Sequence, residues 1–380
     1  MVEQHAKLSA SGSHRWITCP ASVHAESGFR DTSSFAAEEG TLAHSLAEYC
    51  LLMGFDPSEF ANKPFEGAMI DRSMASYVQD YVDYVNSFDG ESYFEQRVSF
   101  SDYVPNGFGT ADAIILQGET LHVIDLKYGK GVVVSPENNS QGMLYAIGAM
   151  SMFSPEKVDK ITDIEIHIYQ PRAQNIASWR LKKHELLQFG QFVKSRANLA
   201  LKPNAPYQPE EKACTFCKAK PTCPALLDVL ETTISPMFSD LDEEDLLPNA
   251  KSLSTEQAAK VLKNKKLIEL FLGAIESHIK EELLSGNAVP GWKLVEGRSI
   301  RRWKDESSAA KFLEQNLPAD DVYSKKIISP TSAEKLLPKG ALINFVEKPN
   351  GAPTLVPESD KRKAITSVSE FFEDLDEGSD

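Results

Sequence analysis

Two aspartates and a lysine stand where short apolar segments begin or end, and together they could form one chemical site. Residues 113–116 and 121–126 are apolar, rich in β-branched side chains and too short for helices, so they predict two buried strands joined as a hairpin. Asp112 enters the first strand, and Asp125 lies near the end of the second with Lys127 two residues on. Because side chains two apart in a strand share a face, Asp125 and Lys127 point to the same side.

A pair of carboxylates at this place requires a compensating charge. Two like charges about 4 Å apart repel by roughly 4 kcal/mol at an effective dielectric of about 20, so the pair either shares a proton or holds a cation. Lys127 favours the cation, because a metal-bound water beside an ammonium group can attack a phosphodiester. Gln141 and Tyr145 follow at i and i+4 of a predicted helix, which turns both toward the same end of the sheet. The alternative is an ordinary hairpin with a surface ion pair.

The order of these residues is more specific than any one of them. The chain has G-x-x-D from Gly109 to Asp112, D-x-K from Asp125 to Lys127 and Q-x-x-x-Y from Gln141 to Tyr145. This ordered set resembles the RecB-like branch of the PD-(D/E)XK nuclease superfamily. The resemblance implies an α/β fold with a restriction-endonuclease-like core, in which helices flank a central mixed sheet. It also implies metal-dependent cleavage of DNA, with these catalytic residues: Asp112, Asp125, Lys127, Gln141 and Tyr145.

The resemblance extends to metal ligands. Residues 40–44 read G-T-L-A-H and match the first motif of the family, in which the histidine binds metal, whereas a histidine alone on a helix is more often packed or solvent-facing. The expected ligands of one or two Mg²⁺ or Mn²⁺ ions are His44, Asp112, Asp125 and the backbone carbonyl of Leu126. Glu95 matches an acid that some family members place near the site, but we favour a solvent-facing strand residue.

Three of the five cysteines stand close together, at Cys214, Cys217 and Cys223. Structural disulfides are rare in cytoplasmic proteins, so this spacing favours a ligand loop. Cys19 is the candidate fourth ligand, because Cys50 lies among leucines and is typical of a small core residue. One cysteine before the core and three after it is similar to AddB-type, exonuclease V-type and CRISPR-associated RecB-like nucleases, which implies a [4Fe–4S] cluster. A zinc site with the same ligands stays open.

Length and composition limit the classes to which this protein can belong. A chain of 380 residues is long enough for two domains, and 42% hydrophobic with 25% charged residues is typical of soluble globular proteins. No apolar run approaches the roughly 20 residues that span a bilayer, and the first residues lack the apolar core of a signal peptide, so we expect a cytoplasmic protein without a membrane partner. The net charge of −15 counts against a tight, sequence-independent coat on duplex DNA.

Apolar periodicity and composition predict further elements and four segments. The elements are an amphipathic helix over 76–88, strands over 93–100 and 161–169, an edge strand over 178–181 and helices over 184–200 and 254–284. The segments are a RecB-like nuclease domain over 1–230, an acidic linker over 231–253, an α+β C-terminal domain over 254–366 and an acidic, disordered tail over 367–380.

Candidate DNA contacts lie outside these motifs. Residues 291–304 predict a hairpin with basic residues between two tryptophans, which suits a single strand because aromatic rings stack on bases and arginines hold phosphates. Inward-packed tryptophans with solvated arginines are the alternative. Arg172, which leaves a predicted strand, would hold a phosphate or remain a solvated loop charge. The candidate residues are Arg172, Trp292, Arg298, Arg301, Arg302 and Trp303.

These observations predict a metal-dependent deoxyribonuclease, and most simply a DNA exonuclease in phage or bacterial recombination or processing. The chain is also similar to a phage-borne family with the same acidic extension. The alternatives are a structure-specific or nicking endonuclease and a non-catalytic DNA-binding scaffold subunit. Phe371 and Phe372 in the acidic tail suggest a docking peptide for a recombination partner, such as a single-strand annealing or binding protein, or a DNA mimic.

Overall fold

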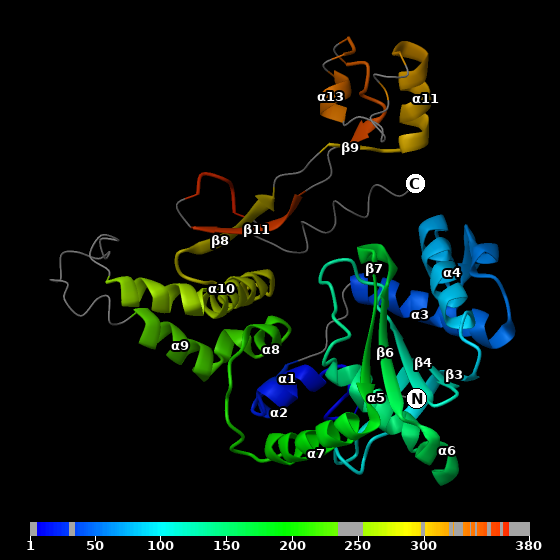
Figure 1. Ribbon diagram of the computed structural model, residues 1–380. Coiled ribbons are helices and arrows are strands. Elements are labelled where there is room, and N and C mark those ends of the chain that lie inside the picture. Colours follow the sequence, from blue (N-terminus) through cyan, green and yellow to red (C-terminus); the bar gives the residue numbers. More distant parts are fainter. Residues whose placement is uncertain are drawn as a thin grey trace. The chain divides into compact units, whose positions relative to one another are not determined.

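The computed structural model describes residues 6–29, 35–234, 254–297, 301–318, 322, 330–334, 336–338, 340–347, 351–357 and 360–364. It is a mixed α/β structure whose central five-stranded sheet is flanked by helices, as expected (Figure 1). The chain divides into two compact units, Met1–Phe271 and Leu272–Asp380. Residues 235–253, which include most of the expected linker, and the tail over 367–380 lie outside the described residues. No helix among the described residues is long and apolar enough to cross a membrane.

The elements have the following bounds. The helices are α1 (Ser13–Thr18), α2 (Ser22–Ala25), α3 (Phe35–Met53), α4 (Arg72–Asn86), α5 (Ser140–Met150), α6 (Pro155–Lys160), α7 (Lys183–Ala200), α8 (Glu211–Thr215), α9 (Pro224–Ile234), α10 (Thr255–Leu284), α11 (Glu306–Asn316) and α13 (Pro330–Glu334). The strands are β1 (Lys63–Phe65), β2 (Ala68–Ile70), β3 (Glu91–Ser99), β4 (Phe108–Gln117), β5 (Thr120–Leu126), β6 (Asp163–Gln170), β7 (Asn175–Lys182), β8 (Trp292–Gly297), β9 (Arg302–Trp303), β10 (Val346–Glu347) and β11 (Gly351–Pro357). Short 3₁₀ turns are η1 (Glu26–Gly28), η2 (Pro57–Phe60), η3 (Pro171–Ala173) and η4 (Lys220–Thr222).

The central sheet has the strand order β3-β4-β5-β6-β7. The predicted hairpin is confirmed, since β4 and β5 are antiparallel with Gln117 opposite Thr120. β5 and β6 are parallel, with Asp125 opposite Ile168, and α5 and α6 lie between them in the chain. A parallel pair needs such a crossover, because a tight turn can join only antiparallel strands. β7 is an edge strand, as its sequence predicts.

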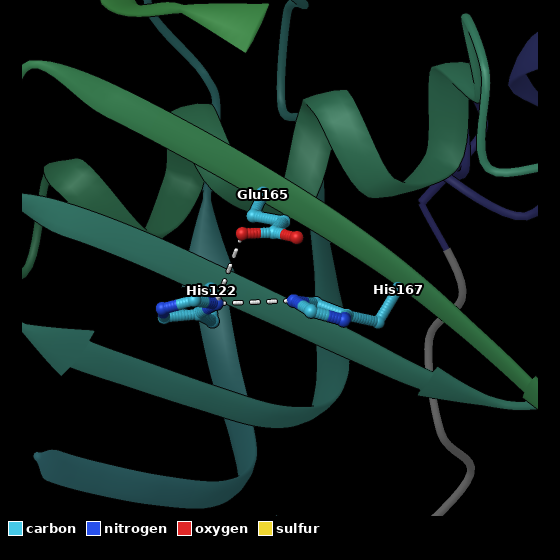
Figure 2. Close-up of side chains that lie close together, drawn as sticks. All are labelled: His122, Glu165 and His167. Atoms are coloured by element: carbon cyan, nitrogen blue, oxygen red, sulfur yellow. Dashed lines mark hydrogen bonds and ion pairs between the residues drawn. The ribbon is translucent and has the colours of Figure 1, made fainter. Parts of the chain in front are cut away.

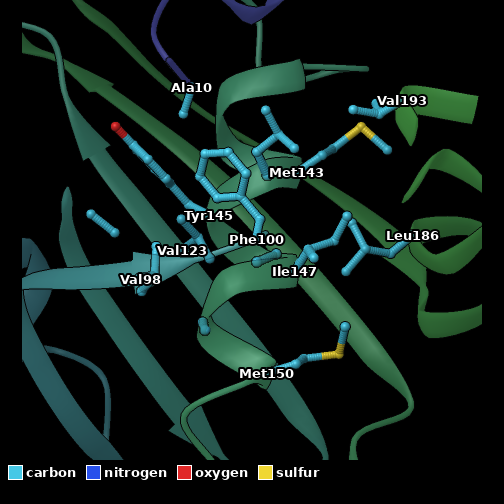
Figure 3. Packing of buried hydrophobic residues seen from close by; sticks show 14 of the residues in the cluster. Ala10, Val98, Phe100, Val123, Met143, Tyr145, Ile147, Met150, Leu186 and Val193 are labelled. Atoms are coloured by element: carbon cyan, nitrogen blue, oxygen red, sulfur yellow. The ribbon is translucent and has the colours of Figure 1, made fainter. Parts of the chain in front are cut away.

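Two apolar clusters cover the two faces of this sheet. The α5 cluster joins α1, α5 and α7 to one face, and Val123, Leu144 and Leu186 are among its members (Figure 3). The α4 cluster joins α3 and α4 to the other face, through residues such as Leu46 and Val78. Alternate residues of β5 enter opposite clusters, so the polar side chains of this strand lie between two packed layers.

Helix ends follow their sequence signals. Asn139 caps α5 by accepting the Gly142 N–H at 3.0 Å. A capping box begins α10, in which Ser254 and Gln257 exchange side-chain to backbone bonds of 2.8 and 3.2 Å. Gly286 follows that helix with φ of 87°, a backbone conformation that favours glycine.

The second unit contradicts the hairpin predicted over 291–304. β8 pairs with β11 and β9 pairs with β10, both antiparallel, so β8 and β9 are not partners. Trp303 packs against a small apolar cluster that includes Leu313 and Leu342. Burial of that cluster therefore favours the pairing of β9 with β10 over a pairing with β8, the nearest strand in the sequence.

Candidate active site

Asp125, Lys127 and Gln141 form one hydrogen-bonded group at the end of β5. The Lys127 Nζ lies 2.8 Å from Asp125 Oδ2 and donates to Gln141 Oε1 at 3.1 Å. The Gln141 Nε2 in turn donates to Asp125 Oδ1 at 3.1 Å and to the Tyr145 hydroxyl at 3.3 Å. The first turns of α5 therefore bring Gln141 and Tyr145 to the strand end, as their i, i+4 spacing predicts.

Asp112 joins this group to α3. Its Oδ2 accepts the backbone N–H of Leu126 at 2.7 Å, and its Oδ1 lies 3.3 Å from His44 Nδ1. Asp112, in the middle of β4, and Asp125, near the end of β5, lie next to the last pair of the β4–β5 ladder, Ala113 and Ile124, so both residues lie at one end of the paired hairpin. The six side chains named by the sequence for catalysis and metal binding thus form two contact groups that meet at the Leu126 amide, namely His44 with Asp112, and Asp125 with Lys127, Gln141 and Tyr145.

Glu95 belongs to this site, and the expectation of a solvent-facing strand acid is wrong. Its Oε1 lies 3.8 Å from His44 Nδ1, and its side chain is half-buried. Glu95 has φ of 43°, in the left-handed region that a non-glycine residue seldom adopts. The regular pairs Phe94–Ala113 and Gln96–Ala111 flank it on both sides. This backbone distortion interrupts the alternation of side chains between the two faces of β3. Counting positions along the strand therefore misplaces the Glu95 side chain.

Two cationic groups balance the buried carboxylates. Burial opposes a charge on His44, but Asp112 and Glu95 outweigh it and raise the pKa of His44 to about 10. Burial likewise opposes a charge on Lys127, yet Asp125 and Asp112 raise its pKa. The pKa of Asp112 is lowered, against the effect of burial, by His44 and Lys127, whereas burial and the Asp112 charge raise the pKa of Asp125. The carboxylates therefore stabilise positive charge on His44 and Lys127 against the effect of burial.

Glycines allow the close packing that places Tyr145 and α5. A Cβ on Gly109 would lie 2.7 Å from Tyr145 Cε1, and a Cβ on Gly142 would lie 2.5 Å from Ile166 Cγ2. Both distances are below any normal carbon contact, so these positions exclude larger residues unless α5 moves. The ring of Tyr145 lies in the α5 cluster with its hydroxyl pointing out of it (Figure 3).

Tyr81 is a further neighbour that its sequence pattern does not reveal. It lies on the apolar stripe of α4 and is 1% exposed. Burial, together with the charges of Asp112 and Asp125, raises the pKa of its hydroxyl. The stripe predicts a core residue, and nothing in the spacing signals that the charges of two carboxylates act on its hydroxyl.

An open cleft borders the His44 side of the group. It has a volume of about 490 Å³ and is lined by Ala37, Gly40, Thr41, His44, Ser45, Glu48 and Glu95. Two of these residues are acids, so a polyanion could enter here only with a cation to screen them.

The four cysteines proposed as ligands line one cavity beside α1 and α8. Burial raises the pKa of Cys19, Cys214 and Cys217. Among these described thiols, no three sulfur atoms lie within 4.8 Å of one another. Cys50 is buried in the α4 cluster, as predicted.

Among the candidate DNA contacts, Arg172 lies in the first unit and has partners of its own. Arg172 forms a 2.8 Å ion pair with Glu39 and stacks over the Tyr128 ring, so it is not a solvated loop charge. In the second unit Arg301 pairs with Glu334, and Trp292 is 36% exposed. Arg298 and the Arg302 side chain lie outside the described residues.

Comparisons with known proteins identify a family. The family described as "Protein of unknown function (DUF2800)" matches residues 5–363, so the chain belongs to that family. A solved structure described as "Crystal structure of SSO0001" matches with a TM-score of 0.29 and 16% identity, over 59% of this chain and 89% of that chain. A TM-score this low carries no conclusion about fold or function.

Proposed function

We propose that this member of the DUF2800 family is a metal-dependent deoxyribonuclease with a RecB-like PD-(D/E)XK core, acting as a DNA exonuclease in the cytoplasm. One observation carries the proposal: Asp125, Lys127 and Gln141 form one hydrogen-bonded group, and Asp112, which accepts the amide of the intervening Leu126, brings His44 to the same strand end. A surface ion pair would not explain why Gln141 bonds to both Asp125 and Lys127 beside a second carboxylate that has its own imidazole partner. Phosphodiester hydrolysis by such a site belongs to the metal-assisted class.

The donor set fits a hard divalent cation with one nitrogen ligand. His44, Asp112 and Glu95 offer three ligand atoms within 4.8 Å of one another. The charge of Asp112 also raises the pKa of the Asp125 carboxyl, so Asp125 lies close to this group. Mg²⁺ and Mn²⁺ prefer carboxylate oxygens, and Mn²⁺ tolerates imidazole better. When bound, the ion would activate a water and stabilise charge on the phosphate.

The residues around the ion have separable tasks. Lys127 keeps its proton at neutral pH, because its pKa is raised, so it orients the attacking water or a phosphate oxygen as a cation. Gln141 holds both Lys127 and Asp125, which limits the rotation of each. Tyr145 supports Gln141 from the next turn of α5.

The same proposal includes a [4Fe–4S] cluster on Cys19, Cys214, Cys217 and Cys223. Its support is the cavity that all four cysteines line. Iron–sulfur clusters are held by four cysteine thiolates, which is the number of cysteines at this cavity. The cluster would join the beginning of the first unit to the segment after α7.

Cleavage assays with matched variants test the function. The full chain, purified without oxygen, would be incubated with end-labelled linear duplex, single strands and closed circular DNA, in Mg²⁺, Mn²⁺ or chelator. We expect Asp125→Asn and Lys127→Gln each to lower cleavage by about 100-fold or more. The exposed pair Asp159→Asn and Lys160→Gln on α6 serves as the control and should cleave as the wild type does.

The outcomes separate the alternatives. Cleavage of linear but not closed circular DNA supports an exonuclease, and cleavage of circles supports an endonuclease. DNA binding without cleavage under any metal condition would replace the nuclease with a scaffold subunit. Full activity in Asp125→Asn or Lys127→Gln would remove these residues from the site.

A further inference from the structure

A second group of metal-ligating side chains lies on the other face of the central sheet. His122 on β5 and Glu165 and His167 on β6 project toward one another (Figure 2). The His122 Nδ1 lies 3.0 Å from His167 Nε2 and 3.9 Å from Glu165 Oε2. The three ligand atoms all lie within 4.8 Å of one another. His122 and His167 are 4% and 3% exposed, which is rare for histidines without a specific task.

Neighbouring residues orient two of the three ligands. The Tyr84 hydroxyl lies 2.9 Å from His167 Nδ1, which leaves Nε2 directed at the shared centre. Ser178 donates to Glu165 Oε1 at 2.9 Å, and Arg180 contacts Oε2 at 2.6 Å. Such outer contacts fix imidazole and carboxylate orientation in known metal sites. Burial lowers the pKa of both histidines, that of His167 to about 4.

We propose that His122, Glu165 and His167 form a buried site for one divalent transition metal, with zinc as its natural occupant. Ligands on tetrahedral zinc at about 2.0–2.1 Å stand roughly 3.3 Å apart. The observed spacings of 3.0 and 3.9 Å lie on either side of that value, so small side-chain rotations would seat the ion. Two imidazoles select zinc-like metals over Mg²⁺ and Ca²⁺, which prefer oxygen.

The group satisfies its polar atoms differently when no metal is bound. One proton between His122 Nδ1 and His167 Nε2 then makes a hydrogen bond, and Tyr84 donates to His167 Nδ1. With metal bound at His167 Nε2, that proton would move to His167 Nδ1, which then donates to the Tyr84 oxygen. Arg180 competes for Glu165 Oε2, but its side chain is 57% exposed and can move into solvent.

This site is separate from the candidate active site. Its ligands lie on the face covered by α4, where Phe88 packs against both imidazoles. Asp125 and Lys127 contact Gln141 of α5, which covers the opposite face. A metal here would tie the parallel strands β5 and β6 together upstream of Asp125. The inference therefore does not depend on nuclease activity.

Metal content by difference tests the proposal. The full chain would be equilibrated with Zn²⁺, passed through a desalting column and analysed for zinc per chain, in the wild type, His122→Gln, Glu165→Gln and His184→Gln. His184 is an exposed histidine on α7 and provides the matched control. We expect His122→Gln and Glu165→Gln each to bind one zinc fewer than the wild type, and His184→Gln to bind the same number. Zinc bound at the cysteines or at His44 is present in the wild type and in every variant, so it cancels when their zinc contents are subtracted.

Two measurements keep the proposal open to refutation if His122→Gln folds poorly. Arg180→Gln removes the competing cation from an exposed position and should tighten zinc binding at this site several-fold. Co²⁺ in the wild type should give a visible band typical of nitrogen and oxygen ligands, and Glu165→Gln should lose it. Equal zinc content in the wild type and Glu165→Gln, with no tightening in Arg180→Gln, would leave only a buried hydrogen-bonded pair of histidines.

Discussion

At the scale of single residues, the candidate site is defined by charges that compensate one another. Asp125 is held by Lys127 and Gln141, and Asp112 by His44 and the Leu126 amide. Each carboxylate thus has a cationic partner while no metal is bound. A bound divalent ion would replace part of the positive charge that now lies beside the carboxylates. Its binding must therefore be linked to the loss of the proton from His44.

This linkage predicts a pH dependence. The charge on His44 is stabilised by Asp112 and Glu95, which against burial raise its pKa to about 10, and only neutral imidazole binds metal. We expect Mn²⁺ affinity to rise with pH between about 7 and 9, by up to about tenfold per unit, as one proton is released for each ion bound. Calorimetric titration in buffers of different ionisation enthalpy measures both quantities. His44→Gln should bind more weakly with a flatter pH profile, and an unchanged slope in this variant would contradict the linkage.

At the scale of elements, the site depends on how closely α5 approaches the sheet. Gly109 on β4 and Gly142 on α5 lie at two such contacts. Between them they set the position of Gln141 and Tyr145 relative to Asp125. The strand pair provides the acids, and the helix provides the amide that orients them.

Adding one methyl group at this contact tests the role of α5. Gly109→Ala should lower the free energy of unfolding by about 1–3 kcal/mol, because its Cβ would clash with the Tyr145 ring. It should also reduce any metal-dependent cleavage, since Tyr145 and Gln141 are displaced together. Gly129→Ala is the matched control, because a Cβ there meets nothing within 4 Å. Chemical denaturation of both variants gives the comparison, and equal stabilities would show that α5 tolerates the shift.

At the scale of the whole chain, distant segments are brought together in the first unit. Cys19 follows α1, whereas Cys214, Cys217 and Cys223 follow α7, and all four line the same cavity. A cluster at that cavity would close a loop of roughly two hundred residues, and closure of a long loop restricts the unfolded chain most. The net charge of −15 makes such a constraint useful, because like charges oppose a compact state.

Replacing the isolated cysteine tests this constraint. In protein purified without oxygen, Cys19→Ser should lose bound iron and the broad visible absorption of an iron–sulfur cluster, and its Tm should fall by about 10 °C. Cys50→Ala is the control, because Cys50 lies in the α4 cluster and should affect packing without changing iron content. Zinc in place of iron, in colourless wild-type protein, would favour the alternative metal.

Local patterns in the sequence predicted much of this molecule. Short apolar runs rich in β-branched residues indicate β4 and β5, alternation indicates β6, and the 3.6-residue stripe indicates α4, because each pattern arises within a single segment of the chain. The ordered acids, lysine and glutamine likewise identified the residues that meet around Asp125. Such features can be predicted because they depend only on residues that are close together in the chain or on motifs with short spacing.

Pairing between distant segments was decided by packing in three dimensions. The β8–β11 pair replaced the nearer hairpin, and the left-handed backbone at Glu95 turned an expected surface acid toward His44. The His122, Glu165 and His167 group exists because β5 and β6 run parallel in one register, with His122 opposite Glu165. A shift of one residue would send these side chains to the other face, and burial on both faces of the sheet excludes that shift.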